Sequence, residues 1–193
     1  MQALERPAEG AADGGLVFFH GYHGIPGDFL GFVDKLDPER RLHAFLPRAM
    51  HPVGDEGRWS WFASDGPRSL DELRPVLDWL DALPFPPGQL VLGGWSQGAV
   101  VAYAAGLGEG RPAPAGVVAL GGALPRGMEI AGSAPVAIGH GRADESVPVA
   151  EARQARDTLR ARGVPTLYLE TDIDHRIDQA IVPALRAFVA GLP

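Results

Sequence analysis

The sequence predicts an α/β fold, in which a mostly parallel sheet of about six to seven strands carries helices on both faces. The first observation is that short apolar runs alternate with segments of helical periodicity along the whole chain. The second is that these runs are continuously apolar, which is typical of strands buried on both faces. Because we find no linker and no internal repeat, we expect a single domain over residues 1–193.

The predicted strands are apolar runs such as "GLVFFHG" and "QLVLGG". The first fifteen residues, rich in Ala, Gly and Glu, are expected to form a loose arm or a weak edge strand. Too few residues separate the runs "GVVALGG" and "PVAIGHG" for a cap domain to fit between them. In order, the predicted strands are residues 15–21, 41–47, 89–94, 115–124, 135–141 and 165–170.

The predicted helices lie between these runs. In the segment 69–83, Ser69 and Glu72 have the spacing of a capping box, and Leu70, Leu73, Leu77 and Leu80 form an apolar stripe. We expect Pro75 to distort this helix and Pro183 to interrupt the last one. Residues 48–67 are expected to be irregular. The full set of predicted helices is 27–37, 69–83, 97–108, 148–163 and 176–191.

Composition excludes several classes of function. The formal net charge of −7 disfavours binding to nucleic acid or to an anionic membrane surface, since both need a basic surface. The absence of Cys excludes disulfides, thiolate catalysis and Cys-based zinc sites. The first ten residues lack the apolar region of a secretory signal, and no apolar run approaches the ~18 residues of a membrane span. We therefore expect a soluble, cytoplasmic enzyme or binding protein.

One short motif carries the strongest chemical signal. Gly94-Trp95-Ser96-Gln97-Gly98 is the only Gly-x-Ser-x-Gly in the chain, and it joins a predicted strand to a predicted helix. A turn this sharp strains the central residue and leaves no room for a Cβ at the flanking glycines. The Ser96 hydroxyl then projects at the carboxyl edge of the sheet, where open α/β sheets bind ligands. The motif predicts that Ser96 is a nucleophile.

A serine nucleophile needs a base to take its proton and an acid to orient that base. His175, in "TDIDHRID", follows the last predicted strand, and Asp144, in "HGRADESVP", follows the one before it. Both come after Ser96 in the order nucleophile, acid, base that α/β-hydrolases use. We predict the triad Ser96, Asp144 and His175. The alternative acids are Glu145, Asp172 and Asp174.

The other histidines come too early in the chain to serve as the base. His20 and His140 each precede a glycine at a strand end, and we expect both to form hydrogen bonds within the loops. His43 falls within a strand and His51 within a loop. A zinc site built on His20 and His23 lacks a third ligand in the sequence, so no metal and no cofactor is expected.

The tetrahedral intermediate of acyl transfer requires two hydrogen-bond donors for its oxyanion. One is expected from the backbone N–H of Gln97, the residue after the nucleophile. The second is expected from the loop "HGYHGIPG", and we assign it to the backbone N–H of Tyr22.

With these residues placed, the chain resembles the phospholipase/carboxylesterase branch of the α/β-hydrolases, which includes bacterial carboxylesterases and acyl-protein thioesterases. The resemblance covers residues 16–191 and rests on "FHGYHG", "GGWSQG", "HGRADESVP" and "DHRI". It implies the same triad, with Tyr22 and Gln97 as oxyanion donors. The segment "RWSWFAS" is similar to the family's Trp-Phe-Asp segment, which implies that Trp61 contacts substrate. Trp95 and His23 are two further candidates for substrate contact.

The chain departs from the family pattern in three places. Ala99 stands where a third glycine is common, Trp95 replaces the usual Phe, and Asp174 replaces the glycine before His175. None of these changes removes a reacting group. The short N-terminal arm also suggests that the antiparallel strands opening this fold are missing or reduced.

The sequence thus predicts a serine esterase that acts on small or flexible acyl esters through an acyl-enzyme. Met50, Trp59, Trp61 and Phe62 are either the lining of an apolar substrate pocket or plain packing. The alternatives are an acyl-thioesterase, lysophospholipase or acyltransferase with the same triad, or a non-catalytic binding protein of the same fold. The expected partner is a small-molecule ester, without nucleic acid or stable membrane insertion. The sequence is also compatible with a homodimer.

Overall fold

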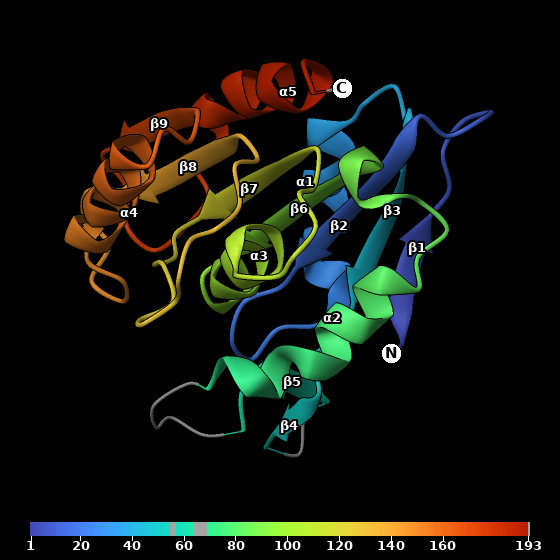
Figure 1. Cartoon of the computed structure of the whole chain (residues 1–193), viewed down its shortest axis with the longest axis horizontal. Helices are drawn as coiled ribbons and strands as arrows, with labels where there is room; N and C mark the ends of the chain where they lie inside the picture. Colours follow the sequence, from blue (N-terminus) through green and yellow to red (C-terminus); the bar gives the residue numbers. More distant parts are fainter. Residues whose placement is uncertain (55–56, 64–68, 193) are drawn as a thin grey trace.

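A computed structural model describes residues 1–54, 57–63 and 69–192 of the chain. Its main feature is a seven-stranded sheet of order β1-β3-β2-β6-β7-β8-β9, shown in Figure 1. Every neighbouring pair in this sheet is parallel except β1 and β3. The strands are β1 (Ala3–Arg6), β2 (Gly14–Phe19), β3 (Leu42–Pro47), β6 (Leu90–Trp95), β7 (Gly116–Leu120), β8 (Val136–Gly141) and β9 (Thr166–Thr171). The mostly parallel sheet predicted from the sequence is confirmed.

Helices cover both faces of the sheet, as predicted. On one face α2 (Arg74–Asp81), α3 (Gln97–Leu107) and α4 (Val149–Ala161) share one apolar core with the strands. On the other face α1 (Leu30–Leu36) and α5 (Val182–Ala190) enclose a second core. In Figure 1, α3 lies in front of the sheet, α1 lies behind it and α5 runs along the top of the view. The central strands β2, β7 and β8 are buried along their whole length, which explains their continuously apolar sequences.

The N-terminal residues form an edge strand, so of the two forms expected for this segment the structure has the strand. β1 pairs antiparallel with β3 from Ala3 opposite Pro47 to Arg6 opposite Ala44. Arg6 is buried, and its guanidinium donates to the Asp37 carboxylate at 2.9 Å. Asp37 also accepts the backbone N–H groups that lead into β3. This buried ion pair fixes the edge strand to the end of α1.

Two proline positions differ from the expectation. Pro75 lies in the first turn of α2 and Pro183 in the first turn of α5, each after a short 3₁₀ turn (Leu70–Leu73 and Gln179–Ile181). Proline is well accommodated there because the first turn of a helix leaves its N–H groups without helical partners. The prolines therefore begin these helices instead of interrupting them.

The capping box before α2 is confirmed. The Ser69 side chain accepts a hydrogen bond from the N–H of Asp71, and Glu72 accepts from the N–H of Ser69. The apolar stripe that follows is only partly as predicted. Its buried members are Leu73, Val76 and Leu80, whereas Leu70 and Leu77 are half-buried.

The segment predicted to be irregular contains a short hairpin. β4 (His51–Val53) and β5 (Arg58–Ser60) pair antiparallel, and Gly24 bridges to Trp59 beside them. Residues 55–56 and 64–68, which belong to the same predicted region, lie outside the described residues. The hairpin lies at the carboxyl end of the sheet, at the bottom of Figure 1.

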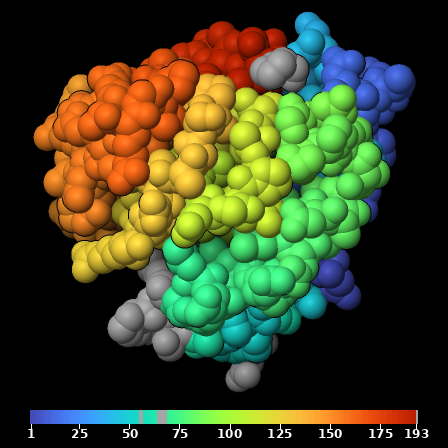
Figure 2. Space-filling view, viewed as in Figure 1, coloured from blue at the N-terminus to red at the C-terminus, as the bar shows by residue number. Residues whose placement is uncertain are grey.

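The connection between β7 and β8, residues 121–135, contains no helix and no strand of the sheet. Figure 2 shows this connection crossing the surface beside α4, and no inserted cap lies in it. Among the described residues, no helix is both long enough and apolar enough to cross a bilayer.

Candidate active site

Ser96 lies at the turn between β6 and α3, with φ 56° and ψ −117°. Few residues other than glycine adopt a positive φ, so the surrounding structure must hold this conformation. A Cβ at Gly94 would overlap the carbonyl group of Gly98, and a Cβ at Gly98 would overlap that of Phe19. The Ser96 N–H donates to Leu120 O at 2.8 Å, which fixes the turn to β7. The turn therefore requires both glycines.

The structure brings Ser96, His175 and Asp144 together. His175 Nε2 lies 3.0 Å from Ser96 Oγ, and His175 Nδ1 lies 2.6 Å from Asp144 Oδ2. A carboxylate can only accept, so Nδ1 carries the hydrogen and Nε2 presents its lone pair to the hydroxyl. Asp144 comes from the loop after β8 and His175 from the loop after β9, at the same edge as Ser96.

The Asp144 carboxylate is held from two sides. Its other oxygen, Oδ1, accepts the backbone N–H groups of Ser146 at 2.9 Å and Val147 at 2.8 Å. The Asp144 side chain is 1% exposed and that of His175 is 20% exposed. A buried carboxylate held by several N–H donors is fixed in place and can orient an imidazole.

The three alternative acids lie elsewhere. Glu145 is exposed, Asp172 binds Arg142, and Asp174 binds Arg176 at the surface. Asp144 is the carboxylate bound to His175.

The residues predicted as oxyanion donors flank Ser96. Gln97 is the first residue of α3, where backbone N–H groups have no partner within the helix. Its buried side chain fixes this end, because Oε1 accepts from Trp61 N at 2.9 Å and Nε2 donates to Ser60 Oγ at 3.1 Å. Tyr22 follows Gly21, where a Cβ would overlap the Trp95 ring at 2.6 Å and would contact Ser96 Cβ at 3.5 Å. The oxyanion role of both N–H groups stays a prediction.

Comparison with known proteins shows the family to which this chain belongs. The chain matches the family described as Phospholipase/Carboxylesterase over residues 6–192, nearly its full length. It belongs to the phospholipase/carboxylesterase family.

Solved structures have the same fold as this chain. Esterase PE8 is 26% identical, with a TM-score of 0.87 over 99% of this chain and 98% of its own. The Bacillus cereus carboxylesterase is 21% identical, with a TM-score of 0.81 over 98% and 93% of the two chains. Zea mays acyl-protein thioesterase 2 is 20% identical, with a TM-score of 0.72 over 98% and 97%. No curated protein matches the sequence.

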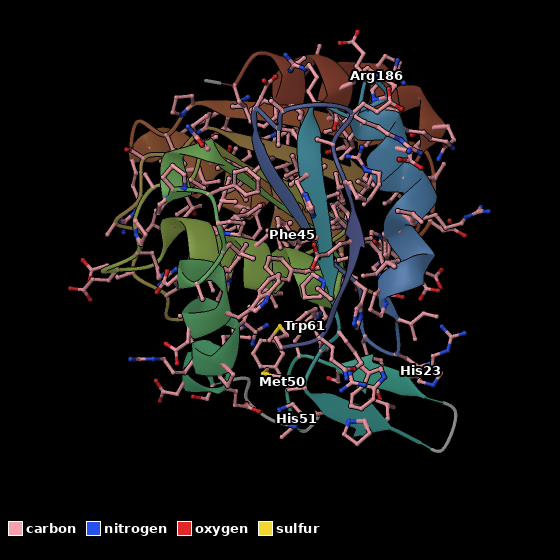
Figure 3. All side chains as sticks on the ribbon, turned by 90° about the vertical axis from the view of Figure 1, so that its right-hand side faces the viewer. His23, Phe45, Met50, His51, Trp61 and Arg186 are labelled. Atoms are coloured by element: carbon pink, nitrogen blue, oxygen red, sulfur yellow. The ribbon has the colours of Figure 1, made fainter. Side chains whose placement is uncertain are left out.

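The three residues predicted to contact substrate lie in different environments. Trp95 is half-buried, and its ring centroid lies 4.7 Å from that of His175. His23 is exposed in the loop after β2, with φ 60°. Substrate contact stays a prediction for both. Figure 3 shows His23 toward the outside and Trp61 in the interior.

Trp61 requires a correction. Its side chain is 0% exposed, and its Nε1 donates to His20 O at 2.7 Å. Its ring packs edge-on against Phe19, in the core beneath the loop after β2. Phe62 is buried as well, so these two side chains support the site from inside and do not line a pocket.

His20 supports the same loop, as the sequence suggested. Its Nε2 accepts the Ala49 N–H at 3.2 Å, and its Nδ1 lies 2.7 Å from Gly21 O. Burial lowers the pKa of His20, the hydrogen bond to Gly21 opposing this in part. A neutral ring with its hydrogen on Nδ1 satisfies both contacts. His20 therefore braces the segment that leads into Tyr22.

Sequence reasoning missed two glycines beside the triad. Gly121 has φ 56°, and a Cβ there would lie 3.6 Å from His175 Cε1 and 3.2 Å from Trp95 Nε1. A Cβ at Gly122 would lie 2.7 Å from Ser96 O and 2.5 Å from Ala99 Cβ. The sequence feature that could have located these two residues is the Gly-Gly pair directly after β7. Among the described residues, no group of three or more potential ligands is placed to hold a metal ion.

Proposed function

We propose that the chain is a serine carboxylic-ester hydrolase that works through an acyl-enzyme at Ser96. The observation that carries the proposal is the continuous contact from Ser96 Oγ to His175 Nε2 at 3.0 Å and from His175 Nδ1 to Asp144 Oδ2 at 2.6 Å. Membership of a family of carboxylesterases and phospholipases supports the same reaction class.

In the first half-reaction Ser96 Oγ attacks the ester carbonyl while His175 Nε2 takes the hydroxyl proton. The imidazolium that forms is stabilised by the Asp144 carboxylate. The oxyanion is held by the backbone N–H groups of Gln97 and Tyr22. His175 then gives its proton to the leaving alcohol, and the acyl group stays on Ser96.

In the second half-reaction His175 takes a proton from water, which attacks the acyl-enzyme. The bond from Ser96 Oγ to the acyl carbon then breaks, His175 returns the proton to Oγ, and the carboxylic acid leaves. No cap lies in the β7–β8 connection, so small or flexible acyl esters are the proposed substrates. Trp95 and His23 are the proposed substrate contacts.

The first prediction concerns the nucleophile. Ser96→Ala should lower kcat for a p-nitrophenyl ester by at least ~10³-fold, because no hydroxyl remains to form the acyl-enzyme. Circular dichroism should show an unchanged fold, since Ser96 has no side-chain cap bond to α3. Ser133→Ala, an exposed serine in the β7–β8 connection, is the matched control and should keep full activity. Activity of Ser96→Ala within about tenfold of wild type would contradict the proposal.

Two measurements separate the alternatives. A fluorophosphonate should label Ser96 in the wild type and leave Ser96→Ala unlabelled, whereas a non-catalytic binding protein would form no adduct. A series of p-nitrophenyl esters from acetyl to palmitoyl, with an acyl-CoA beside it, distinguishes an esterase from a thioesterase. Products formed with added alcohol reveal acyl transfer.

A further inference from the structure

His140, at the end of β8, lies against the carboxylate that orients His175. Its side chain is 0% exposed, and its Nε2 forms a hydrogen bond of 2.7 Å with Val147 O. The same Nε2 lies 3.3 Å from Asp144 Oδ2, the oxygen that also binds His175 Nδ1 at 2.6 Å. Two imidazoles therefore face one carboxylate oxygen, and the mechanism above uses only one of them.

The partners of His140 determine its hydrogen position. Val147 O can only accept, so Nε2 must carry a hydrogen. Nδ1 is buried and has no hydrogen-bond partner among the described residues. An unpartnered N–H buried away from water is costly, so a ring with its hydrogen on Nε2 and its lone pair on Nδ1 fits this environment. His140 thus donates its Nε2–H to Val147 O, and the same nitrogen lies 3.3 Å from Asp144 Oδ2.

The contacts of His140 span the loop that carries the acid. Asp144 Oδ1 accepts the N–H of Val147, and the C=O of Val147 accepts from His140. The loop is therefore fixed to the buried imidazole of His140 at the end of β8. His140 Nε2 also lies 3.3 Å from Asp144 Oδ2, so the imidazole packs directly against the carboxylate.

We propose that His140 is a positioning residue for the reaction at Ser96, holding the Asp144 loop through Val147 O. The inference rests on the proposed function and deepens it, since it adds a fourth side chain to the serine, histidine and aspartate. His140 touches neither Ser96 nor substrate and acts through Asp144.

Other charged groups near this pair are already bound to partners. Glu170, opposite His140 in the β8–β9 register, binds Arg142 and Arg153. On α4, Glu151 lies 4.0 Å from Arg126, and beside His175 the Asp174 carboxylate binds Arg176. Glu145 is exposed to solvent. A change confined to residue 140 leaves all of these pairs in place.

The test compares three substitutions. His140→Gln keeps an N–H donor at the reach of Nε2, because the Gln side-chain nitrogen is as far from the backbone as Nε2 is. His140→Asn places the same amide one methylene short, and His140→Leu keeps a side chain of similar size without a donor. Gln and Asn are thus a matched pair that differs in reach alone.

We expect kcat within about 5-fold of wild type for the Gln variant and ~10–100-fold lower for Asn and Leu, with KM changed by less than about 3-fold. The rate of fluorophosphonate labelling at Ser96 should fall in the same order. Thermal unfolding shows which variants are folded at the assay temperature. If Leu is not folded there, the Gln and Asn pair decides.

The ratio of the Gln and Asn activities separates positioning from a purely structural role. Equal activity in Gln and Asn when both are folded, or a loss that appears in KM and not in kcat, would overturn the inference. An active Ser96→Ala would instead overturn the proposed function.

Discussion

Ser96 has a backbone conformation that its neighbours impose. Its positive φ persists because β7 accepts its N–H and because two glycines allow β6, α3 and β2 to approach closely. Strain of this kind costs on the order of 1–3 kcal/mol and must be offset by packing elsewhere. In return, the hydroxyl already lies in hydrogen-bond contact with His175 before any substrate arrives. The reacting group is oriented in advance, which lowers the cost of reaching the transition state.

His20 should make stability depend on pH. Burial lowers its pKa in the folded chain, whereas the unfolded chain binds a proton below about pH 6.5. The unfolded state then binds more protons, so stability should fall as pH falls below this value, by at most about 1.4 kcal/mol per pH unit. His20→Gln keeps an acceptor for Ala49 N–H but does not titrate, so it should lose less stability between pH 8 and pH 5.5.

Urea unfolding of both proteins at the two pH values measures this difference. For each protein, the change in the free energy of unfolding between the two pH values is taken as a slope. Comparing the slopes of His20→Gln and wild type cancels any constant loss from the substitution. Parallel slopes would show that His20 does not contribute.

At the scale of elements, a cluster of charged side chains joins β9, α4 and the loop after β8. Glu170 on β9 binds Arg142 from that loop and Arg153 from α4, and it accepts the Tyr168 hydroxyl. The Glu170 side chain is 12% exposed, whereas both arginines are about half exposed. The cluster connects the edge strand to the segment that carries Asp144.

The stabilisation that this cluster contributes should be lost at low pH. The hydrogen bond from Arg153, followed by that from Tyr168, lowers the pKa of Glu170 to about 2. Its contribution is complete above the unfolded value near 4.5 and is lost as pH falls from 4.5 toward 2. Because the arginines are open to solvent, we expect at most about 1 kcal/mol.

Glu170→Gln should therefore be less stable than wild type at pH 7 and equally stable near pH 2. Chemical unfolding across this range measures the convergence. The exposed Glu109→Gln in the turn after α3 is the control, and it should follow wild type at every pH. A constant difference between Glu170→Gln and wild type down to pH 2 would contradict the assignment.

The type and order of most elements could be predicted from the sequence because buried parallel strands and their helices have distinct patterns. The hairpin β4–β5 could not, because its strands of three residues are half-buried and contain Pro52, so they have no clear period. Pro75 and Pro183 were placed inside helices because a 3₁₀ turn before each proline has nearly the same apolar spacing as an α-helix.

For the candidate site, the motifs located the loops but not the depth of each side chain. The order of Ser96, Asp144 and His175 along the chain was enough to place them at one edge, since parallel strands all end there. Burial of Trp61 could not be read from a segment whose neighbours include exposed residues. The contact of His140 with Asp144 depends on how the loop folds back across four residues, which no local pattern encodes.

At the scale of the whole molecule, a buried ion pair fixes the edge strand β1 to the rest of the fold. Arg6 and Asp37 are each 5% exposed, and Arg6 also donates to Leu42 O at 3.1 Å. Residues 31 positions apart are joined there, beyond the reach of any helix or turn. The pair joins β1 to the helix and strand that follow β2.

Asp37→Ala should destabilise the fold by about 3–5 kcal/mol, because buried Arg6 would lose its closest carboxylate and keep only the more exposed Asp34, 3.5 Å from its Nε. Arg6→Met with Asp37→Ala should cost less than the sum of the two single changes, since no buried charge is left. Urea unfolding of the four proteins measures this coupling. Arg41→Met, which removes a half-exposed pair with Asp13, is the control and should change stability by less than about 1 kcal/mol. Additive single changes would show that the buried pair is uncoupled.

α3 is buried along all of its residues, from Gln97 to Leu107. A helix with no side facing water has no way to fray or detach while the rest of the chain stays native, so its amide hydrogens exchange only in global opening events. The hydroxyl that starts the chemistry is anchored at the first turn of this helix. On heating, the Ser96 hydroxyl should therefore stay reactive until the whole domain unfolds. Loss of its reactivity and thermal unfolding should occur at the same temperature.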